Sequence, residues 1–361
     1  MKILICTGIY PPDIGGPATY SKLLKDELPS RGFEVDVLSF GEVRKWPRGI
    51  RHIVYFFKVL LKAFSVDVLY AQDPVSVGLP SVLVAKILHK KFLLKIVGDY
   101  AWEQLQIKNF SSELITLEIF QSQEYSLITE LRRRIERRVA NEADKIVVPS
   151  EYLKGIVEKW GVVKDKITVI YNSLEGGIAE LVTKKENIIF SAGRLVPWKG
   201  FDLLIELMCE LPDDFKLFIA GTGPQESNLK LKIKNLKLEN RVFLLGGLNQ
   251  NEMHKYFGLA KIFVLNTSYE GLSHIILESM QNSVPVVTTD IGGNPELIKN
   301  EYNGLLVEYN NKNELKEAIL RVIKDNFLQS KFIENSHKEL SRFSLETMLE
   351  SLSLILKSLN H

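Results

Sequence analysis

Two cations flank a short loop in the segment IIFSAGRLVPWKGFDLLIE, where Arg194 and Lys199 lie between a buried apolar run and a helical pattern. In a parallel sheet such a loop lies beyond the carboxyl end of a strand, where backbone N–H groups and a helix N-terminus point outward. Arg as a planar fork and Lys as a point charge could clamp a diphosphate there. A pair of solvated surface cations is the alternative, and these residues taken alone leave both open.

Two carboxylates follow in the segment YEGLSHIILESM. Glu270 falls in the loop after the apolar run KIFVLN, and Glu278 falls within the next helical pattern, on the same face as His274. The start of this helix can donate backbone N–H groups to an anion, and a carboxylate at Glu278 can accept hydrogen bonds from the vicinal hydroxyls of a ribose. Without further motifs, two carboxylates at this spacing are usually surface residues.

Glycines stand at two other predicted strand ends. Gly15 and Gly16 precede Pro17, a residue suited to the first turn of a helix, so they offer either a side-chain-free phosphate cradle or a tight turn. Gly221 and Gly223, in FIAGTGP, also permit close backbone approach after an apolar run. None of these is the G-x-G-x-x-G fingerprint followed by an acidic residue about 20 positions later, which argues against a dehydrogenase.

The composition excludes several classes of protein. The chain has 361 residues, 45% hydrophobic and 25% charged, which predicts a folded protein of about two domains. A net charge of +2 gives no signature of nucleic-acid binding. Two cysteines, Cys6 and Cys209, exclude a disulfide scaffold or a cysteine zinc site and favour a reducing, cytoplasmic compartment. The histidines lack metal-ligand spacing, and no apolar run reaches the ~20 residues of a membrane-spanning helix.

Short apolar runs alternate with helical periodicity along the whole chain, which predicts parallel sheets covered by helices on both faces. The runs form two series, separated by a Gly-rich stretch at 173–187 that we interpret as a linker. We therefore expect two doubly wound α/β domains, at 1–175 and 176–340, and a final helix in 341–361 that returns to the first domain. The predicted strands are 2–6, 33–40, 66–71, 91–98, 145–150, 167–172, 187–193, 215–221, 242–246, 261–266 and 284–290.

Five motifs in one order make this sequence resemble the retaining glycosyltransferases of family 4. They are PPDIGG, SAGRLVPWKG, IAGTGP, the pair Glu270 and Glu278, and VPVVTTDIGGNPELI, spread over roughly residues 1–325. The resemblance implies the GT-B fold, in which two Rossmann-like doubly wound domains face a central cleft. It also implies that residues 1–175 bind the acceptor and residues 176–340 bind a nucleotide-sugar donor.

The same resemblance assigns a role to each matching residue. Arg194 and Lys199 would neutralise the donor diphosphate as charge builds up on the leaving group, and Glu270 would hydrogen bond to the hydroxyls of the donor sugar. Glu278 would hold the ribose. The family needs no metal and no cofactor, because cations and helix termini stabilise the diphosphate. The remaining donor-binding positions would be Gly15, Gly16, Gly221, Gly223, Gly271, Leu272 and Ser273.

The resemblance thus predicts a metal-independent hexosyltransferase of polysaccharide biosynthesis. It would move a sugar from a nucleotide-diphosphate sugar, UDP in preference to GDP, to a hydroxyl of a glycan or a lipid-linked saccharide. Since no well-placed nucleophile is evident, retention favours front-face displacement, with the leaving phosphate helping to deprotonate the acceptor hydroxyl. Two alternatives stay open: a nucleotide-sugar epimerase or hydrolase with the same fold, and an inactive nucleotide-sugar-binding subunit.

Asp99 departs from the family pattern, since many relatives carry a His at roughly its place. In the segment KFLLKIVGDYAWEQ it follows Gly98 and a predicted strand. A carboxylate there could bind a hydroxyl of the donor or the acceptor, or orient the acceptor in catalysis. It could equally cap the following helix, and both interpretations stay open.

The stretch from Arg44 to Phe64 combines aromatic residues with six Lys or Arg. If its helix is exposed, the aromatics and cations predict peripheral association with anionic membranes, weakened by salt, and a lipid-linked acceptor. If the aromatics pack against the first sheet, the helix belongs to the core and only its cations stay in solvent. The expected location is cytoplasmic in both cases.

Overall fold

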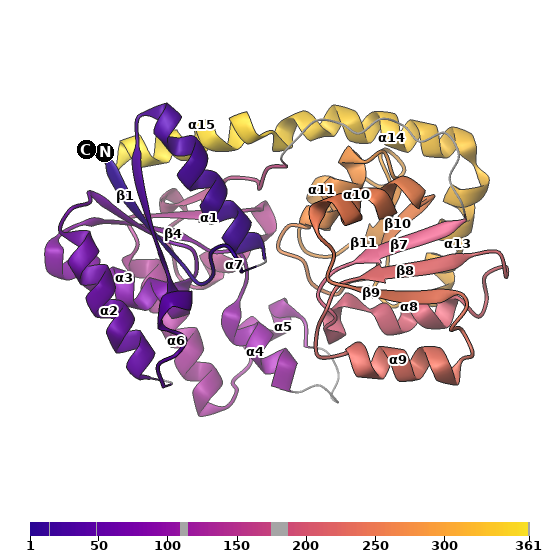
Figure 1. Ribbon diagram of the computed structural model, residues 1–361, viewed down its shortest axis with the longest axis horizontal. Coiled ribbons are helices and arrows are strands. Elements are labelled where there is room, and N and C mark those ends of the chain that lie inside the picture. The colour runs from indigo at the N-terminus through magenta and orange to yellow at the C-terminus, as the bar shows by residue number, and fades with distance from the viewer. Residues whose placement is uncertain (14, 48, 109–114, 175–186, 360–361) are drawn as a thin grey trace. The chain divides into compact units, whose positions relative to one another are not determined.

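The structure is a computed structural model that describes residues 1–13, 15–47, 49–108, 115–174 and 187–359 (Figure 1). The chain divides into two compact units. Unit 1 comprises Met1–Leu105, Leu117–Tyr171 and Leu345–His361, and unit 2 comprises Gln106–Thr116 and Asn172–Ser344. Most of the predicted linker at 173–187 lies outside the described residues.

Unit 1 is built on a parallel sheet of six strands in the order β2-β1-β3-β4-β5-β6. The strands are short apolar runs, and in β3 every residue is buried, as expected for a sheet with helices on both faces. The strands are β1 (Lys2–Thr7), β2 (Glu34–Ser39), β3 (Val68–Ala71), β4 (Lys91–Lys95), β5 (Lys145–Val148) and β6 (Ile167–Val169).

Helices connect the strands of unit 1 (Figure 1). Helix α15 comes from the far end of the chain, and its Met348, Leu352 and Leu356 join the same core as Ile3 and Ile5 of β1. The helices are α1 (Gly16–Glu27), α2 (Ile50–Ala63), α3 (Leu79–Leu88), α4 (Tyr100–Lys108, of which the part from Gln106 onward is assigned to unit 2), α5 (Leu117–Ser122), α6 (Leu127–Glu142), α7 (Glu151–Lys159) and α15 (Leu345–Ser358).

Unit 2 has a second parallel sheet of six strands, in the order β12-β11-β10-β7-β8-β9. This is the Rossmann order, in which the direction of winding reverses between the first and fourth strands, here β7 and β10. The strands are β7 (Ile188–Ala192), β8 (Lys216–Ala220), β9 (Val242–Gly246), β10 (Ile262–Leu265), β11 (Val286–Thr289) and β12 (Leu305–Val307). The helices are α8 (Phe201–Leu207), α9 (Glu226–Asn235), α10 (Gln250–Leu259), α11 (His274–Gln281), α12 (Asn294–Leu297), α13 (Lys312–Lys324) and α14 (Asn326–Leu340).

The prediction of two doubly wound α/β folds with parallel sheets is confirmed. One strand, β12, was missing from the predicted set. It is only three residues long and pairs with β11 alone, at the edge of the sheet. So short an apolar run has no periodicity of its own, and its pairing partner rather than its local sequence makes it a strand.

Candidate functional site

The loops that follow β7 and β10 meet where the strand order of unit 2 reverses. The two strands are neighbours, with Ile262 opposite Ile189. Ligands of open parallel sheets bind at such a point, beyond the carboxyl ends of the strands. The β7 loop carries Arg194 and Lys199, and the β10 loop carries Glu270. The predicted cations and the first predicted carboxylate therefore share one edge of one sheet.

Lys199 and Glu270 form an ion pair across this edge. Lys199 ends a 3-10 turn, η5 (Pro197–Lys199), and its side chain runs over Gly193, where an added Cβ would lie 3.4 Å from Lys199 Cε. The Lys199 and Glu270 side chains are only 13% and 14% exposed. Taking two charges out of water is costly, so each compensates the other. Lys199 is thus not a solvated surface cation.

Arg194 is exposed, and its guanidinium carbon lies 5.3 Å from the centroid of the Trp198 ring. Trp198 itself is buried, with 3% of its surface exposed. A cation over an aromatic face is attracted by the ring quadrupole, so this contact restrains the guanidinium fork. The two cations of this loop are therefore restrained differently, one by an ion pair and the other by an aromatic ring.

Glycines let the loops at this edge approach one another through their backbones. Gly221, with a φ of 140°, leaves no room for a Cβ, which would overlap the carbonyl oxygen of Gly193. Gly223 is closed in by the backbone of Leu195, whose N–H donates to Thr222 O at 2.9 Å. The close approach predicted for these two glycines is thus made by a neighbouring loop of the protein. Their contact with a donor stays a prediction.

Asn266 fastens three loops at this edge, and the sequence did not reveal it. It directly follows β10 and is 1% exposed. Its Nδ2 donates to Gly200 O at 3.2 Å and to Asn310 Oδ1 at 3.1 Å, and its Oδ1 accepts from Asn310 N at 3.2 Å. The Thr267 hydroxyl donates to Trp198 O at 2.9 Å. The η5 turn is therefore held by side chains of the β10 loop, and a polar residue at the end of a predicted strand was the available signal.

The start of α11 lies next along the β10 loop. Gly271, Leu272 and Ser273 lead into this helix, and all three are buried. Ser273 stands at the N-cap position, yet its hydroxyl does not cap the helix, and none of the described residues hydrogen bonds to its Oγ. A buried hydroxyl without a partner is costly unless a ligand or water contacts it. Ser273 and the helix N-terminus are thus suited to an anion or a sugar hydroxyl.

Glu278 lies in the second turn of α11 and is half-buried. Burial raises its pKa to about 7, and the charge of His254 acts in the opposite direction. Asn282 links the two residues: its Oδ1 lies 2.8 Å from His254 Nδ1, and its Nδ2 donates to Glu278 O at 2.8 Å. Glu278 therefore changes charge near neutral pH, as binding and catalytic groups often do.

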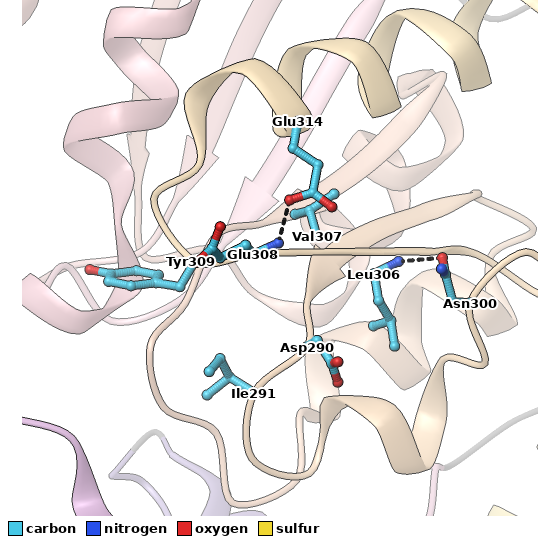
Figure 2. Close-up of a pocket in the computed structure, with 8 residues that line it drawn as sticks. All are labelled: Asp290, Ile291, Asn300, Leu306, Val307, Glu308, Tyr309 and Glu314. Carbon is cyan, nitrogen blue, oxygen red and sulfur yellow. Dashed lines mark hydrogen bonds between the residues drawn. The ribbon is translucent and has the colours of Figure 1, made fainter. Parts of the chain in front are cut away.

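A pocket of about 450 Å³ lies beyond the ends of β11 and β12 (Figure 2). Its wall includes three carboxylates, and the one on Glu314 accepts from Glu308 N at 2.8 Å. None of the residues predicted for the site lines it, and negative charge disfavours a diphosphate. The lining residues are Asp290, Ile291, Asn300, Leu306, Val307, Glu308, Tyr309 and Glu314.

Gly15 and Gly16 belong to unit 1, at the start of α1. The helix begins at Gly16 and has Pro17 in its first turn, as predicted. A Cβ added at Gly16 would meet nothing within 4 Å, so this position is open to solvent. A phosphate cradle at these glycines stays a prediction.

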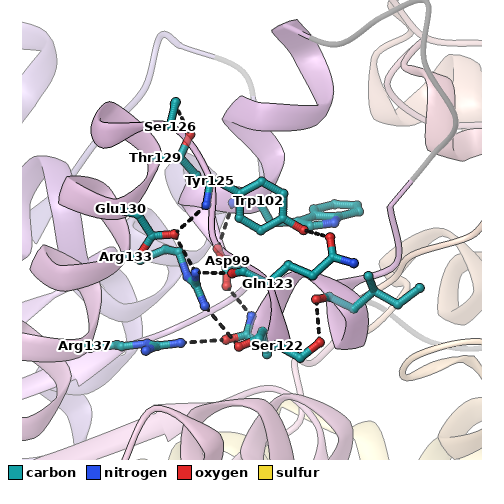
Figure 3. Close-up of polar contacts among 12 residues, drawn as sticks. Asp99, Trp102, Ser122, Gln123, Tyr125, Ser126, Thr129, Glu130, Arg133 and Arg137 are labelled. Atoms are coloured by element: carbon teal, nitrogen blue, oxygen red, sulfur yellow. Dashed lines mark hydrogen bonds and ion pairs between the residues drawn. The ribbon is translucent and has the colours of Figure 1, made fainter.

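Asp99 also belongs to unit 1 and is 1% exposed at the start of α4 (Figure 3). Its Oδ1 accepts from Trp102 N at 2.8 Å, and its Oδ2 accepts from Gln121 Nε2 at 2.9 Å. Burial raises its pKa, while these hydrogen bonds act in the opposite direction. Oδ1 thus caps α4, and Oδ2 links α4 to α5, in agreement with helix capping, one of the two roles that the sequence left open. A catalytic or hydroxyl-binding role for Asp99 stays a prediction.

Within the described ranges, no group of three or more His, Cys, Asp or Glu is arranged to hold a metal ion. None of the helices in those ranges is long and apolar enough to cross a bilayer. Both cysteines have free thiols, buried at Cys6 and exposed at Cys209.

Two family models match the chain. Residues 14–175 match the model described as Glycosyltransferase Family 4. Residues 178–339 match the model described as Glycosyl transferases group 1. Every residue predicted for the site falls within one of the two matches.

Known relatives and a solved structure agree with these matches. An uncharacterized glycosyltransferase of Methanocaldococcus jannaschii is 28% identical, over 96% of this chain and 95% of its own length. The N-acetylgalactosamine-N,N'-diacetylbacillosaminyl-diphospho-undecaprenol 4-alpha-N-acetylgalactosaminyltransferase of Campylobacter jejuni is 33% identical, over 53% of this chain and 54% of its own length. The crystal structure of Anabaena HepE in complex with UDP and glucose is similar in fold, with a TM-score of 0.77 and 20% identity over 99% of this chain and 100% of that one.

Replacing Asn266 tests whether the loops at this edge depend on its side chain. In Asn266→Ala the buried carbonyl of Gly200 loses a hydrogen bond, so we expect the free energy of unfolding of unit 2 to fall by ~1–3 kcal/mol. Denaturant titration measures the change. Asn251→Ala, at an exposed position on α10, is the matched control and should cost under ~0.5 kcal/mol. Equal stability of the two variants would contradict the conclusion that hydrogen bonds of the Asn266 side chain stabilise these loops.

Proposed function

Since the chain belongs to the family 4 glycosyltransferases (glycosyl transferases group 1) and has their GT-B fold, we propose that it transfers a sugar from a nucleotide-diphosphate sugar to an acceptor hydroxyl. The observation that carries the proposal is the Lys199–Glu270 pair at the switch point of unit 2, with Arg194 on the same loop as Lys199. Two cations and a carboxylate at this edge suit a diphosphate and a sugar hydroxyl, respectively.

In the proposed mechanism, the loop after β7 stabilises the leaving group. Negative charge builds up on the diphosphate as the glycosidic bond breaks, and Arg194 and Lys199 neutralise it. Glu270 forms the ion pair with Lys199 and also accepts hydrogen bonds from the hydroxyls of the donor sugar. Ser273 and the backbone amides that precede α11 bind sugar or phosphate oxygens. Groups of the protein thus stabilise the negative charge of the diphosphate, as a metal ion would otherwise do.

We assign the rest of the donor to neighbouring residues. Glu278 accepts hydrogen bonds from the ribose hydroxyls, and the Gly221 and Gly223 loop lies along the same edge of unit 2. Gly15 and Gly16 of unit 1 approach the diphosphate through their backbone. Unit 2 is thus the donor-binding unit, and unit 1 is the acceptor-side unit. UDP is the preferred nucleotide, supported by the family resemblance and by the UDP complex of HepE.

Retention of configuration by front-face displacement completes the proposal. The acceptor hydroxyl attacks from the side of the departing diphosphate, whose oxygen takes the proton, and orientation of the two substrates supplies much of the rate enhancement. A hydrolase or epimerase would instead release free sugar or epimer without any acceptor. A binding subunit would bind the donor and release nothing.

The acceptor we propose is a glycan or a lipid-linked saccharide. The Campylobacter relative, by its name, acts on a diphospho-undecaprenol-linked saccharide. An acceptor of this kind places the enzyme in the cytoplasm at the membrane surface, in polysaccharide biosynthesis.

A panel of nucleotides and nucleotide sugars tests the proposed donor. A ligand at ~100 times its dissociation constant should stabilise the chain by about 2.7 kcal/mol, which a thermal-shift assay detects. The donor that stabilises is then assayed for transfer to saccharide acceptors. If none of the UDP or GDP compounds stabilises the chain, the proposal is contradicted.

Arg194→Ala and Lys199→Ala test the diphosphate clamp. Each should lower kcat/KM by roughly two to three orders of magnitude, comparable to the loss of one preorganised donor to developing charge. Steady-state transfer kinetics measure the effect. Lys234→Ala, an exposed cation on α9, is the matched control and should leave kcat/KM unchanged. Near-normal turnover in both site variants would rule the clamp out.

Glu278→Gln tests the ribose contact through its pH dependence. Because the pKa of Glu278 is about 7, its carboxylate is mostly protonated at pH 6 and mostly charged at pH 8. We expect the variant to bind donor about as well as the native chain at pH 6 and ~10-fold more weakly at pH 8, where a charge-assisted hydrogen bond is lost. Calorimetry measures both values. Glu239→Gln, an exposed carboxylate, is the control, and a pH-independent ratio would argue against the role.

Chelation tests the metal-independent mechanism. We expect full transfer activity in excess EDTA, because Arg194 and Lys199 supply the positive charge that a divalent cation would otherwise bring. Initial rates with and without EDTA give the answer. Loss of activity that Mg²⁺ or Mn²⁺ restores would overturn this mechanism.

A further inference from the structure

Trp198 lies in the middle of the η5 turn, between the two cations of the proposed diphosphate clamp. It is buried, and the guanidinium carbon of Arg194 lies 5.3 Å from the centroid of its ring. A cation within about 6 Å of an aromatic centroid is attracted by the ring quadrupole. The mechanism proposed above gives this ring no part, although the ring contacts a residue that the mechanism needs.

The backbone of Trp198 is held by the loop after β10. Its carbonyl oxygen accepts two hydrogen bonds, from Thr267 Oγ1 at 2.9 Å and from Ser268 N at 2.8 Å. Gly200, which follows the turn, has a φ of 59°, and a Cβ added there would lie 2.2 Å from the carbonyl oxygen of Asn266. The ring therefore belongs to a turn whose position is set by a neighbouring strand end, and it is a fixed support for a side chain that lies on it.

Arg194 needs such a support because its side chain is long and exposed. An arginine side chain has many rotamers, and ordering them when a ligand binds costs conformational entropy. A contact that orders the guanidinium beforehand removes part of this cost from donor binding and from the reaction. Orientation of Arg194 before the donor binds is therefore expected to raise the rate of transfer.

An aromatic ring suits this task better than a carboxylate. The negative charge of Glu270, which holds Lys199, competes with a diphosphate for that cation. Trp198 has no charge, so it attracts the guanidinium without repelling a diphosphate. The attraction acts on the charge of the guanidinium and occupies none of its N–H donors, which are the groups that bind phosphate oxygens. The ring contact can therefore persist while Arg194 binds the leaving group.

We propose that Trp198 is a positioning residue for sugar transfer: its ring orients the Arg194 guanidinium for the donor diphosphate. The inference rests on the proposed function and deepens it, because Trp198 acts on the leaving group only through Arg194. Negative charge on the leaving diphosphate is greatest at the transition state, so loss of the ring lowers kcat more than it weakens donor binding.

Steady-state kinetics of two Trp198 variants test this role. Trp198→Leu should lower kcat/KM about tenfold, mostly through kcat, and Trp198→Phe should stay within about threefold of the native chain, because a phenyl ring also attracts a cation. The matched control is Phe215→Leu, which removes another buried ring of unit 2, just before β8 at the amino end of the sheet. The control should leave kcat/KM unchanged. Native activity in Trp198→Leu, or an equal loss in the control, would overturn the proposal.

Double variants separate positioning from packing. If Trp198 acts only through Arg194, Trp198→Leu should lower kcat/KM by less than about twofold in the Arg194→Ala background. In the Lys199→Ala background it should still lower kcat/KM about tenfold, because Arg194 is then present. A loss of about tenfold in both backgrounds would show that the substitution damages the whole turn, and it would overturn the proposal.

Trp198 fluorescence tests the contact without donor or acceptor, and the first comparison leaves Trp198 itself unchanged. All four tryptophans of the sequence lie in the described ranges, and Trp198 alone belongs to unit 2. A positive charge beside an indole ring shifts its emission, so Arg194→Ala should move the emission maximum, whereas Lys234→Ala should not. In the Trp198→Phe background, Arg194→Ala should produce no shift. Native emission in Arg194→Ala would show that cation and ring are not in contact, and it would overturn the proposal.

Different results would overturn the proposed function and the positioning role. If the native chain binds and turns over no UDP or GDP sugar, the transferase function fails, and Trp198 emission still responds to Arg194→Ala. If the native chain is an active transferase and Trp198→Leu transfers sugar at the native rate, only the positioning role fails.

Discussion

The reversal of strand order between β7 and β10 is the constraint on which unit 2 depends. Strands on the two sides of this point wind in opposite directions, so right-handed connections send the helices after β7 and β10 to opposite faces of the sheet. The two strand ends are then left uncovered by helices. Their loops must be held by their own polar groups, and Asn266 and Thr267 provide those contacts for the η5 turn.

The same constraint explains the Lys199–Glu270 pair. Loops that meet above neighbouring strands bring together side chains that are far apart in sequence, and little solvent surrounds them. In such a place one charge needs another, since an unpaired buried ion is costly. In the proposed function, Lys199 of this pair binds the diphosphate and Glu270 binds the donor sugar, and the charge of each residue is already offset before the ligand arrives. For Glu278, burial raises the pKa to about 7, and the charge of His254 only partly opposes this shift.

Unit 1 uses its polar and apolar groups differently. Asp99 is buried, and its two oxygens accept hydrogen bonds from Trp102 N at the start of α4 and from Gln121 Nε2. On the outer side of the sheet, α2 gives one apolar face to the core and leaves the other exposed. Lys58 and Lys62 of α2 pair with carboxylates of the η2 turn (Phe40–Val43) and of β2, and Arg44, which precedes the helix, pairs with Asp13 before α1. The apolar face is left as the main feature that distinguishes this surface.

The sequence by itself determined the class of fold and which candidate site residues lie at the ends of elements. Runs of Val, Ile and Leu marked all strands but β12, and Pro17, Arg194, Lys199 and Glu270 fell at strand ends or helix starts, because local patterning is enough to show where an element begins and stops. Only the tertiary structure decided which distant groups pair. Lys199 with Glu270, Asn266 with Gly200 and Asp99 with Gln121 depend on strand order and loop packing, which no local pattern encodes. The same holds for α2: both of its faces are apolar, so periodicity could not choose between them, and only packing against the sheet decides that Tyr55 is buried and Phe57 exposed.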